Sequence, residues 1–182
     1  MSEITVRVAT PHDADGISRV KIDTWRYAYK HILDPTVLKE LDVARDSAKW
    51  KERLSESGER ERCWVACDQD RVVGFLYLGP NRFDEVDCDG ELQAIYVLPS
   101  HHRRGVGHMM LREGVDWMVA DGFKSMAVFV FRDNPIGVGF YRSTGAELHD
   151  EAELEIGGKK YPDQCYVWPS LADLQSKLRQ GE

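Results

Sequence analysis

A glycine-bearing turn between a strand pattern and a helix pattern constrains the fold of this 182-residue chain more than any other feature. The turn is the segment 102–107, His-Arg-Arg-Gly-Val-Gly. Apolar residues alternate over 91–98 before it, and apolar residues at helical spacing over 106–118 follow it. A second strand pattern occupies 125–131. Strand, turn, helix and strand form a βαβ unit, which predicts a parallel strand pair with a right-handed connection.

The two glycines of this turn, Gly105 and Gly107, make it a candidate anion site. Glycine adopts positive φ at little cost, so several backbone N–H groups can approach a ligand at the positive end of the helix dipole. Arg103 and Arg104 add fixed positive charge. A helix start with a solvated basic pair is the alternative. No Lys-Ser or Lys-Thr follows Gly107 and position 110 is Met110, which excludes a nucleoside-triphosphate loop and a dinucleotide fingerprint.

A second motif follows this unit along the chain. Asn134 precedes a proline, Tyr141 lies seven residues further on, and a Gly-Ala pair follows at 145–146. Together with the turn, this pattern resembles the GNAT superfamily of acetyl-CoA-dependent N-acyltransferases over about residues 90–150. The chain departs from that pattern in carrying His102 where the family usually has Gln or Arg, and Ala146 where it often has Phe.

The resemblance implies one N-acetyltransferase domain over residues 1–182, with a cofactor-binding core at about 90–150 and acceptor-side helices at about 12–57. The order of elements predicts a layered α/β (α+β) fold, a mixed sheet with packed helices. The resemblance further implies that the sheet is largely antiparallel, with a splayed central parallel strand pair and helices on both faces.

Acetyl-CoA is the co-substrate that the resemblance implies. Its diphosphate is expected on backbone N–H groups of the turn, and its pantetheine arm along the main chain of the first strand, as an added half-strand. The expected cofactor-binding residues are Ile95, Tyr96, Val97, Arg103, Arg104, Gly105, Val106, Gly107, His108, Asn134 and Tyr141.

Two residues are expected to move protons. Tyr141 is the family's usual general acid for the departing thiolate, with packing of its helix as the alternative role. Glu91 is the expected base, acting through water, because histone-acetylating relatives resemble this chain in having a glutamate at the start of the central strand. An ordinary strand-end carboxylate is its alternative. Asn134 is expected both to cap a helix and to meet the cofactor or a water molecule.

The acceptor is expected near the first two helices and the acidic segment 84–91. Residues 25–29, Trp-Arg-Tyr-Ala-Tyr, resemble a segment in one branch of the superfamily, and its first and last residues share a helix face. Core packing is the alternative for these aromatic residues, and a solvated loop for the acidic ones. The expected substrate-binding residues are Trp25, Tyr29 and Glu85.

The composition limits the partners. A net charge of −7 has the wrong sign for a nucleic-acid-binding protein, whereas a basic turn in an acidic chain suits a small anionic cofactor. No apolar run is long enough to span a bilayer and no leader pattern is present, which predicts a cytoplasmic protein without a membrane partner. The four cysteines lack the spacing of a metal site, so no metal is expected.

These patterns predict an acyltransferase that moves an acetyl group from acetyl-CoA to a primary amine of a small molecule or peptide. The transfer is expected to be direct, in a ternary complex without an acyl-enzyme step. A catalytically weak acyl-CoA-binding sensor is the alternative, and a structural protein that reuses the fold is a second one. A homodimer is the family-level expectation.

Overall fold

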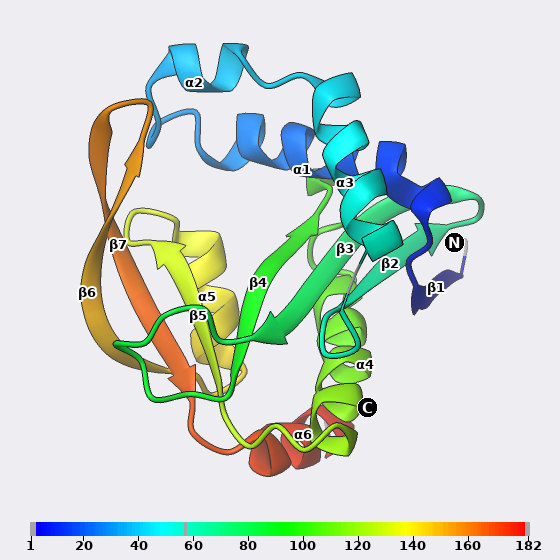
Figure 1. Ribbon diagram of the computed structural model, residues 1–182, viewed down its shortest axis with the longest axis vertical. Coiled ribbons are helices and arrows are strands. Elements are labelled where there is room, and N and C mark those ends of the chain that lie inside the picture. The colour runs from blue at the N-terminus through cyan, green and yellow to red at the C-terminus, as the bar shows by residue number, and fades with distance from the viewer. Residues whose placement is uncertain (1–2, 57, 181–182) are drawn as a thin grey trace.

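The computed structural model describes residues 3–56 and 58–180. Its centre is one seven-stranded sheet of order β1-β2-β3-β4-β5-β7-β6 (Figure 1). Neighbouring strands are antiparallel except β4 and β5, which are parallel. The strands are β1 (Ile4–Val8), β2 (Arg62–Asp68), β3 (Arg71–Pro80), β4 (Gly90–Val97), β5 (Met126–Phe131), β6 (Glu147–Ile156) and β7 (Lys159–Trp168).

Helices cover both faces of the sheet. They are α1 (Ala14–Ala28), α2 (Pro35–Lys39), α3 (Val43–Glu56), α4 (Val106–Ala120), α5 (Pro135–Ser143) and α6 (Leu171–Gln180), with short 3-10 turns η1 (Pro11–Asp13) and η2 (Pro99–His101). Alternating residues of β3 show the two layers, because successive strand side chains point to opposite faces. Phe75 and Tyr77 pack on Trp50 of α3, with ring centroids 5.2 and 5.5 Å apart. Leu76 lies instead under Gly114 of α4, where an added Cβ would approach its Cδ2 to 2.6 Å.

The parallel pair diverges after a short contact. Residues 90–92 of β4 pair with residues 126–128 of β5, and no later residue of β4 pairs with β5. On its other edge β4 stays paired with β3 up to Val97, with a register shift that leaves Gln93 as an extra residue. Such a β-bulge bends the strand locally. The predicted fold is thereby confirmed, including the splayed central pair.

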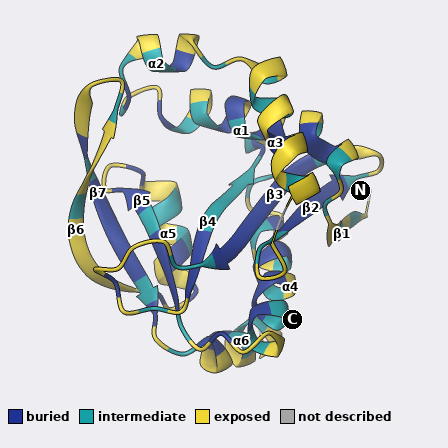
Figure 2. Cartoon of the chain, viewed as in Figure 1, coloured by how far each residue is buried: buried dark blue, intermediate teal, exposed yellow. Residues whose placement is uncertain are grey.

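The strand β6 forms one edge of the sheet and is mostly exposed, whereas β7 beside it is mostly buried (Figure 2). The two strands meet at Gly157 and Gly158, whose φ angles are +59° and +77°, and a two-residue hairpin turn of this kind requires positive φ at both positions. Within the described ranges no helix is long and apolar enough to cross a membrane.

One helix begins earlier than its sequence pattern, and one helix has no counterpart in the sequence predictions. Helical spacing of apolar residues predicts a helix over about residues 46–57; the observed helix α3 begins at Val43, and residue 57 lies outside the described residues. The C-terminal helix α6 was not expected. It packs along α4, where Gln175 and Arg179 bind Asp116 Oδ1 at 2.7 and 3.0 Å.

Candidate active site

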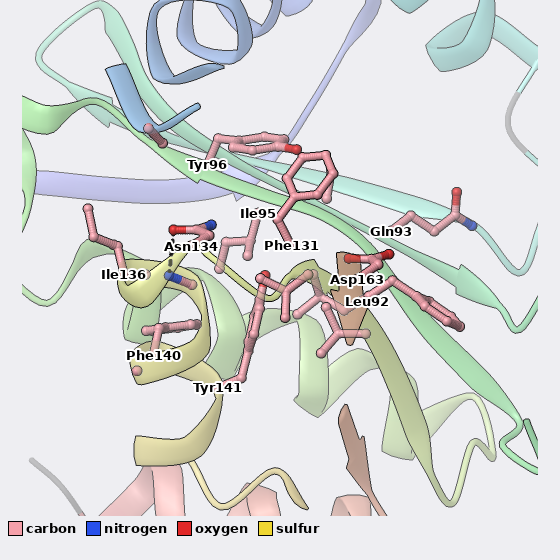
Figure 3. Close-up of a pocket in the computed structure, with 18 of the residues that line it drawn as sticks. Leu92, Gln93, Ile95, Tyr96, Phe131, Asn134, Ile136, Phe140, Tyr141 and Asp163 are labelled. Atoms are coloured by element: carbon pink, nitrogen blue, oxygen red, sulfur yellow. Dashed lines mark hydrogen bonds between the residues drawn. The ribbon is translucent and has the colours of Figure 1, made fainter. Parts of the chain in front are cut away.

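A cleft of about 1470 Å³ opens where β4 and β5 diverge (Figure 3). Its walls come from α1, β4, the turn before α4, β5, α5, β6 and β7, so segments far apart in the sequence meet there. Most of the residues predicted from the sequence line this cleft: Trp25, Tyr29, Glu85, Glu91, Ile95, Tyr96, Val97, Arg103, Gly105, Val106, Gly107, His108, Asn134 and Tyr141. Arg104 does not line it, because its guanidinium faces Asp68 at 3.7 Å.

The turn before α4 has the backbone shape of an anion site. Gly105 is the N-cap of α4 with φ +77°, and Arg103 has φ +60°. The N–H groups of Val106, Gly107 and His108 form the first turn of α4, where no residue of the helix can accept their hydrogen bonds. A turn with left-handed residues directly before a helix can present a concave set of N–H donors that suits an anion.

Two histidines hold this turn in place. His102 Nε2 lies 2.9 Å from the carbonyl oxygen of Val97, which ties the turn to the last residue of β4. His101 Nε2 lies 3.0 Å from Asp68 Oδ2 at the end of β2. His102, at a position where the family usually has Gln or Arg, therefore has a hydrogen-bond partner that fixes the turn to β4.

Gly107 has a packing role that the sequence did not reveal. A Cβ at this position would approach Phe140 Cε2 of α5 to 3.1 Å, so the glycine lets α4 and α5 come close beside the cleft. By contrast, a Cβ at Gly105 would meet no atom within 4 Å. The space beside Gly105, which lines the cleft, is therefore open to a ligand.

Asn134 caps α5, as predicted. Its Oδ1 accepts a hydrogen bond from the Gly137 N–H at 3.2 Å, and Pro135 occupies the first position of the helix. The Asn134 side chain is buried at the edge of the cleft (Figure 3).

Tyr141 reaches from α5 toward the middle of the cavity (Figure 3). Its ring packs edge-on against Trp168 and Phe140, with centroid distances of 5.8 and 5.7 Å. Burial raises the pKa of the phenol well above its usual value, and the nearby Tyr96 and Asp163 raise it further. Tyr141 is therefore protonated at neutral pH.

Glu91 is buried in the wall of the cleft and is held by Arg82. The guanidinium forms two hydrogen bonds to the carboxylate, Nη2 to Oε1 at 2.6 Å and Nε to Oε2 at 2.8 Å. The backbone N–H of Arg82 adds a third, at 3.3 Å. The carboxylate in turn raises the pKa of the Arg82 guanidinium. The sequence did not reveal this pairing, since Arg82 lies in the loop before β4.

Trp25 and Tyr29 pack against each other and also face the cleft. Their rings pack edge-on at 5.3 Å, and Tyr29 also packs on Phe131 of β5 at 5.0 Å. Both residues line the cleft as well. The Trp25 indole N–H is buried and makes no hydrogen bond to any described residue.

Asp163 of β7 is a site residue that the sequence analysis missed. It lines the cleft with only 5 % of its surface exposed. Burial raises its pKa to about 6, and the backbone N–H of Gln164 opposes that shift in part. The available signal was a charged residue that shares a strand face with Tyr161 and Cys165.

Metal ligands are not grouped anywhere in the described part of the chain: no three His, Cys, Asp or Glu side chains stand close enough to hold an ion. The cysteines Cys63, Cys67, Cys88 and Cys165 are free thiols.

Comparison with known proteins agrees with this geometry. The sequence model of the acetyltransferase (GNAT) family matches residues 24–146. The uncharacterized N-acetyltransferase YuaI of Bacillus subtilis is 34% identical over 176 residues, which cover 96% of this chain and 98% of YuaI. The peptidyl-lysine N-acetyltransferase YjaB of Salmonella typhimurium is 28% identical over 123 residues, 67% of this chain and 75% of YjaB.

Among solved structures, the PaiA N-acetyltransferase of Thermoplasma acidophilum in complex with coenzyme A superposes with a TM-score of 0.73 at 20% identity, covering 92% of this chain and 99% of that one. The chain belongs to the acetyltransferase (GNAT) family. The predicted family and the predicted enzyme class, an N-acetyltransferase, are confirmed.

Proposed function

We propose that the cleft between β4 and β5 binds acetyl-CoA and that the enzyme transfers its acetyl group directly to a primary amine of a small molecule or peptide. The observation that carries this proposal is the divergence of β4 and β5 beside the positive-φ turn. Similar solved structures support it, since PaiA was crystallised with coenzyme A and the putative acetyltransferase YncA of Salmonella typhimurium (18% identity, TM-score 0.65, 91% of this chain and 93% of that one) with acetyl-CoA.

The residues present fit this ligand. The turn offers N–H donors and open space at Gly105 for a diphosphate, with the exposed Arg103 beside it. Beyond residue 92, the β5-facing edge of β4 has no strand partner, so the main chain of Ile95, Tyr96 and Val97 is available to the pantetheine amides. Arg104 contributes less directly in this arrangement, because its partner is Asp68.

The chemistry requires a proton donor and a proton acceptor. Bound acetyl-CoA supplies the acetyl group as a thioester. Tyr141 is the proposed acid, since its protonated phenol faces the cleft. The role of Glu91 as a base acting through water stays a prediction, and its two carboxylate oxygens already accept hydrogen bonds from Arg82.

Thermal unfolding with acetyl-CoA, followed by an assay of thiol release over a panel of amines, tests the proposal. A ligand that binds only the folded state stabilises it, by about 2.7 kcal/mol at about 100 times its Kd. Stabilisation together with amine-dependent thiol release is the expected result. Stabilisation without release from any amine would indicate the acyl-CoA sensor, and the absence of stabilisation would remove the cofactor assignment.

Gly105→Ala tests the anion site. At φ +77° an L side chain costs about 1–2 kcal/mol, and relief of that strain displaces the N–H donors of the turn. We expect the Kd for coenzyme A, measured by calorimetry, to rise about tenfold or more, which corresponds to about 1.4 kcal/mol.

Gly122→Ala is the matched control, because Gly122 has φ +89° in open space at the other end of α4 and does not line the cleft. Its strain is similar, so we expect a similar loss of stability with unchanged affinity for coenzyme A. If the two variants bind coenzyme A with equal affinity, its diphosphate does not bind at the turn before α4.

The homodimer and the cytoplasmic location stay predictions, as does the binding of the acceptor by Trp25, Tyr29 and Glu85. Light scattering of the purified protein, with and without acetyl-CoA, measures whether it is a dimer.

A further inference from the structure

Asp163 is a buried carboxylate without a cation. It lines the cleft from β7 with 5 % of its surface exposed, and no ion pair joins it to a basic side chain in the described part of the chain. An unpaired buried charge costs free energy, and such groups concentrate at functional sites. The other buried carboxylate of the cleft, Glu91, is not unpaired, because it forms an ion pair with Arg82.

The groups around Asp163 come from several elements. Besides burial, ionised Asp163 raises the pKa of Tyr29 at the C-cap of α1, of Tyr141 of α5 and of Cys165 of β7 itself, and Tyr96 of β4 lines the same cleft. Two further carboxylates, Glu91 and Asp150, also act on Cys165. On the neighbouring strands its register partners are Phe131 of β5 and Ala152 of β6, which carry no charge. Figure 3 shows Tyr96, Tyr141 and Asp163 around the same cavity.

The phenols and the thiol among these neighbours remain neutral at physiological pH. Burial raises the pKa of each of the three phenols, and it raises the pKa of the Cys165 thiol to about 12. Within this group, Asp163 alone changes its charge near neutral pH. Among these groups Asp163 is the one that carries a charge, and a carboxylate beside aromatic rings suits an organic cation.

We propose that Asp163 binds the ammonium group of the acceptor and removes its proton, so that the substrates of this enzyme are amines that are cationic at neutral pH. The proposal rests on the proposed function, since it places the acceptor in the same cleft as acetyl-CoA. The acidic side chains Glu85 and Asp150, which line the cleft, favour the approach of such a cation.

The proton balance of the transfer is complete with these residues. Asp163 takes one of the three ammonium protons, and the freed lone pair of the nitrogen forms a bond to the acetyl carbon. The carbon–sulfur bond breaks with its electron pair on sulfur, which takes the phenol proton of Tyr141. The nitrogen loses a second proton, which restores Tyr141, and keeps the third in the amide. Asp163 releases its proton to solvent.

The two residues are coupled through charge. Ionised Asp163 is one of the groups that raise the pKa of Tyr141. When Asp163 takes the proton of the acceptor, that negative charge disappears and the phenol becomes a stronger acid. Deprotonation of the amine thus prepares the group that protonates the leaving thiolate.

Asp163→Asn tests the proposal, because asparagine keeps the shape of the side chain without its charge. The probes are 1,5-diaminopentane, which is cationic at neutral pH, and aniline, which is neutral. With the diamine we expect kcat/KM to fall about 100-fold or more, with the Kd for coenzyme A unchanged. The wild-type kcat/KM is expected to decrease as the pH falls through about 6, and the variant is expected to lack this limb.

Glu155→Gln is the matched control, since it removes an exposed negative charge from the same hairpin outside the cleft and should leave kcat/KM unchanged. The proposal is overturned if Asp163→Asn keeps both its kcat/KM and the decrease of kcat/KM at acid pH, or if Glu91→Gln removes that decrease instead. It is also overturned if wild type acetylates aniline as well as the diamine, or does not acetylate the diamine at all. Failure of acetyl-CoA to bind wild type would instead refute the proposed function, and calorimetry detects that separately.

Discussion

Replacing Tyr141 with phenylalanine is expected to lower kcat by about 100-fold or more, the usual contribution of a positioned proton donor. Phenylalanine keeps the ring that packs against Trp168 and Phe140, so the helix α5 and the cleft retain their shape. We expect the affinity for coenzyme A to change little, because the phenol acts on the leaving sulfur. Single-turnover thiol release and calorimetry measure the two effects separately.

Tyr161→Phe is the matched control for this substitution. Tyr161 is another buried phenol, and its oxygen accepts a hydrogen bond from the Asp34 N–H at 3.1 Å, but it does not line the cleft. Losing this hydrogen bond should cost about 1 kcal/mol of stability and leave kcat unchanged. Full activity in Tyr141→Phe would show that its hydroxyl serves packing alone.

Structural features that depend on residues close together in the sequence could be predicted from the sequence. The positive-φ Gly105 and the Asn134 cap depend on contacts within one turn and one helix, so their spacing along the chain specifies them. The orientation of Tyr141 toward the cleft follows from its position on the same helix as that cap.

Contacts between distant segments were not predictable from spacing. Asp163 enters the cleft because β7 pairs with β5, which places it opposite Phe131. Arg82 reaches Glu91 only because the loop before β4 folds back over the strand. Both contacts depend on sheet order and loop path, which periodicity within a single strand does not determine.

The helix α6 was missed for a different reason, its short length. Its apolar residues Leu171, Leu174 and Leu178 have helical spacing, so a signal was present. The segment is short, and isolated helices of this length are marginally stable. Contacts with α4 stabilise α6. Among them, the Asp116 carboxylate of α4 accepts hydrogen bonds from Gln175 and Arg179 of α6.

Replacing Asp163 with asparagine is expected to stabilise the protein while it removes activity. Folding raises the pKa of this carboxyl from 3.8 to about 6, so the folded state holds its proton more tightly than the unfolded state. Stability therefore decreases as the pH rises between these two values, and the full cost is present above them. At 1.36 kcal/mol for each pH unit, the cost reaches about 3 kcal/mol.

Urea unfolding at about pH 7.5 and about pH 4 measures this difference. Asparagine carries no charge at either pH, so Asp163→Asn should exceed wild type by up to about 3 kcal/mol at the higher pH and by much less at the lower one. Glu155→Gln, on the exposed edge strand, should change stability by less than about 0.5 kcal/mol. If the asparagine variant is instead less stable at the higher pH, the carboxylate has a structural partner. A gain of stability with a loss of turnover is typical of a charge whose environment serves catalysis at the expense of the fold.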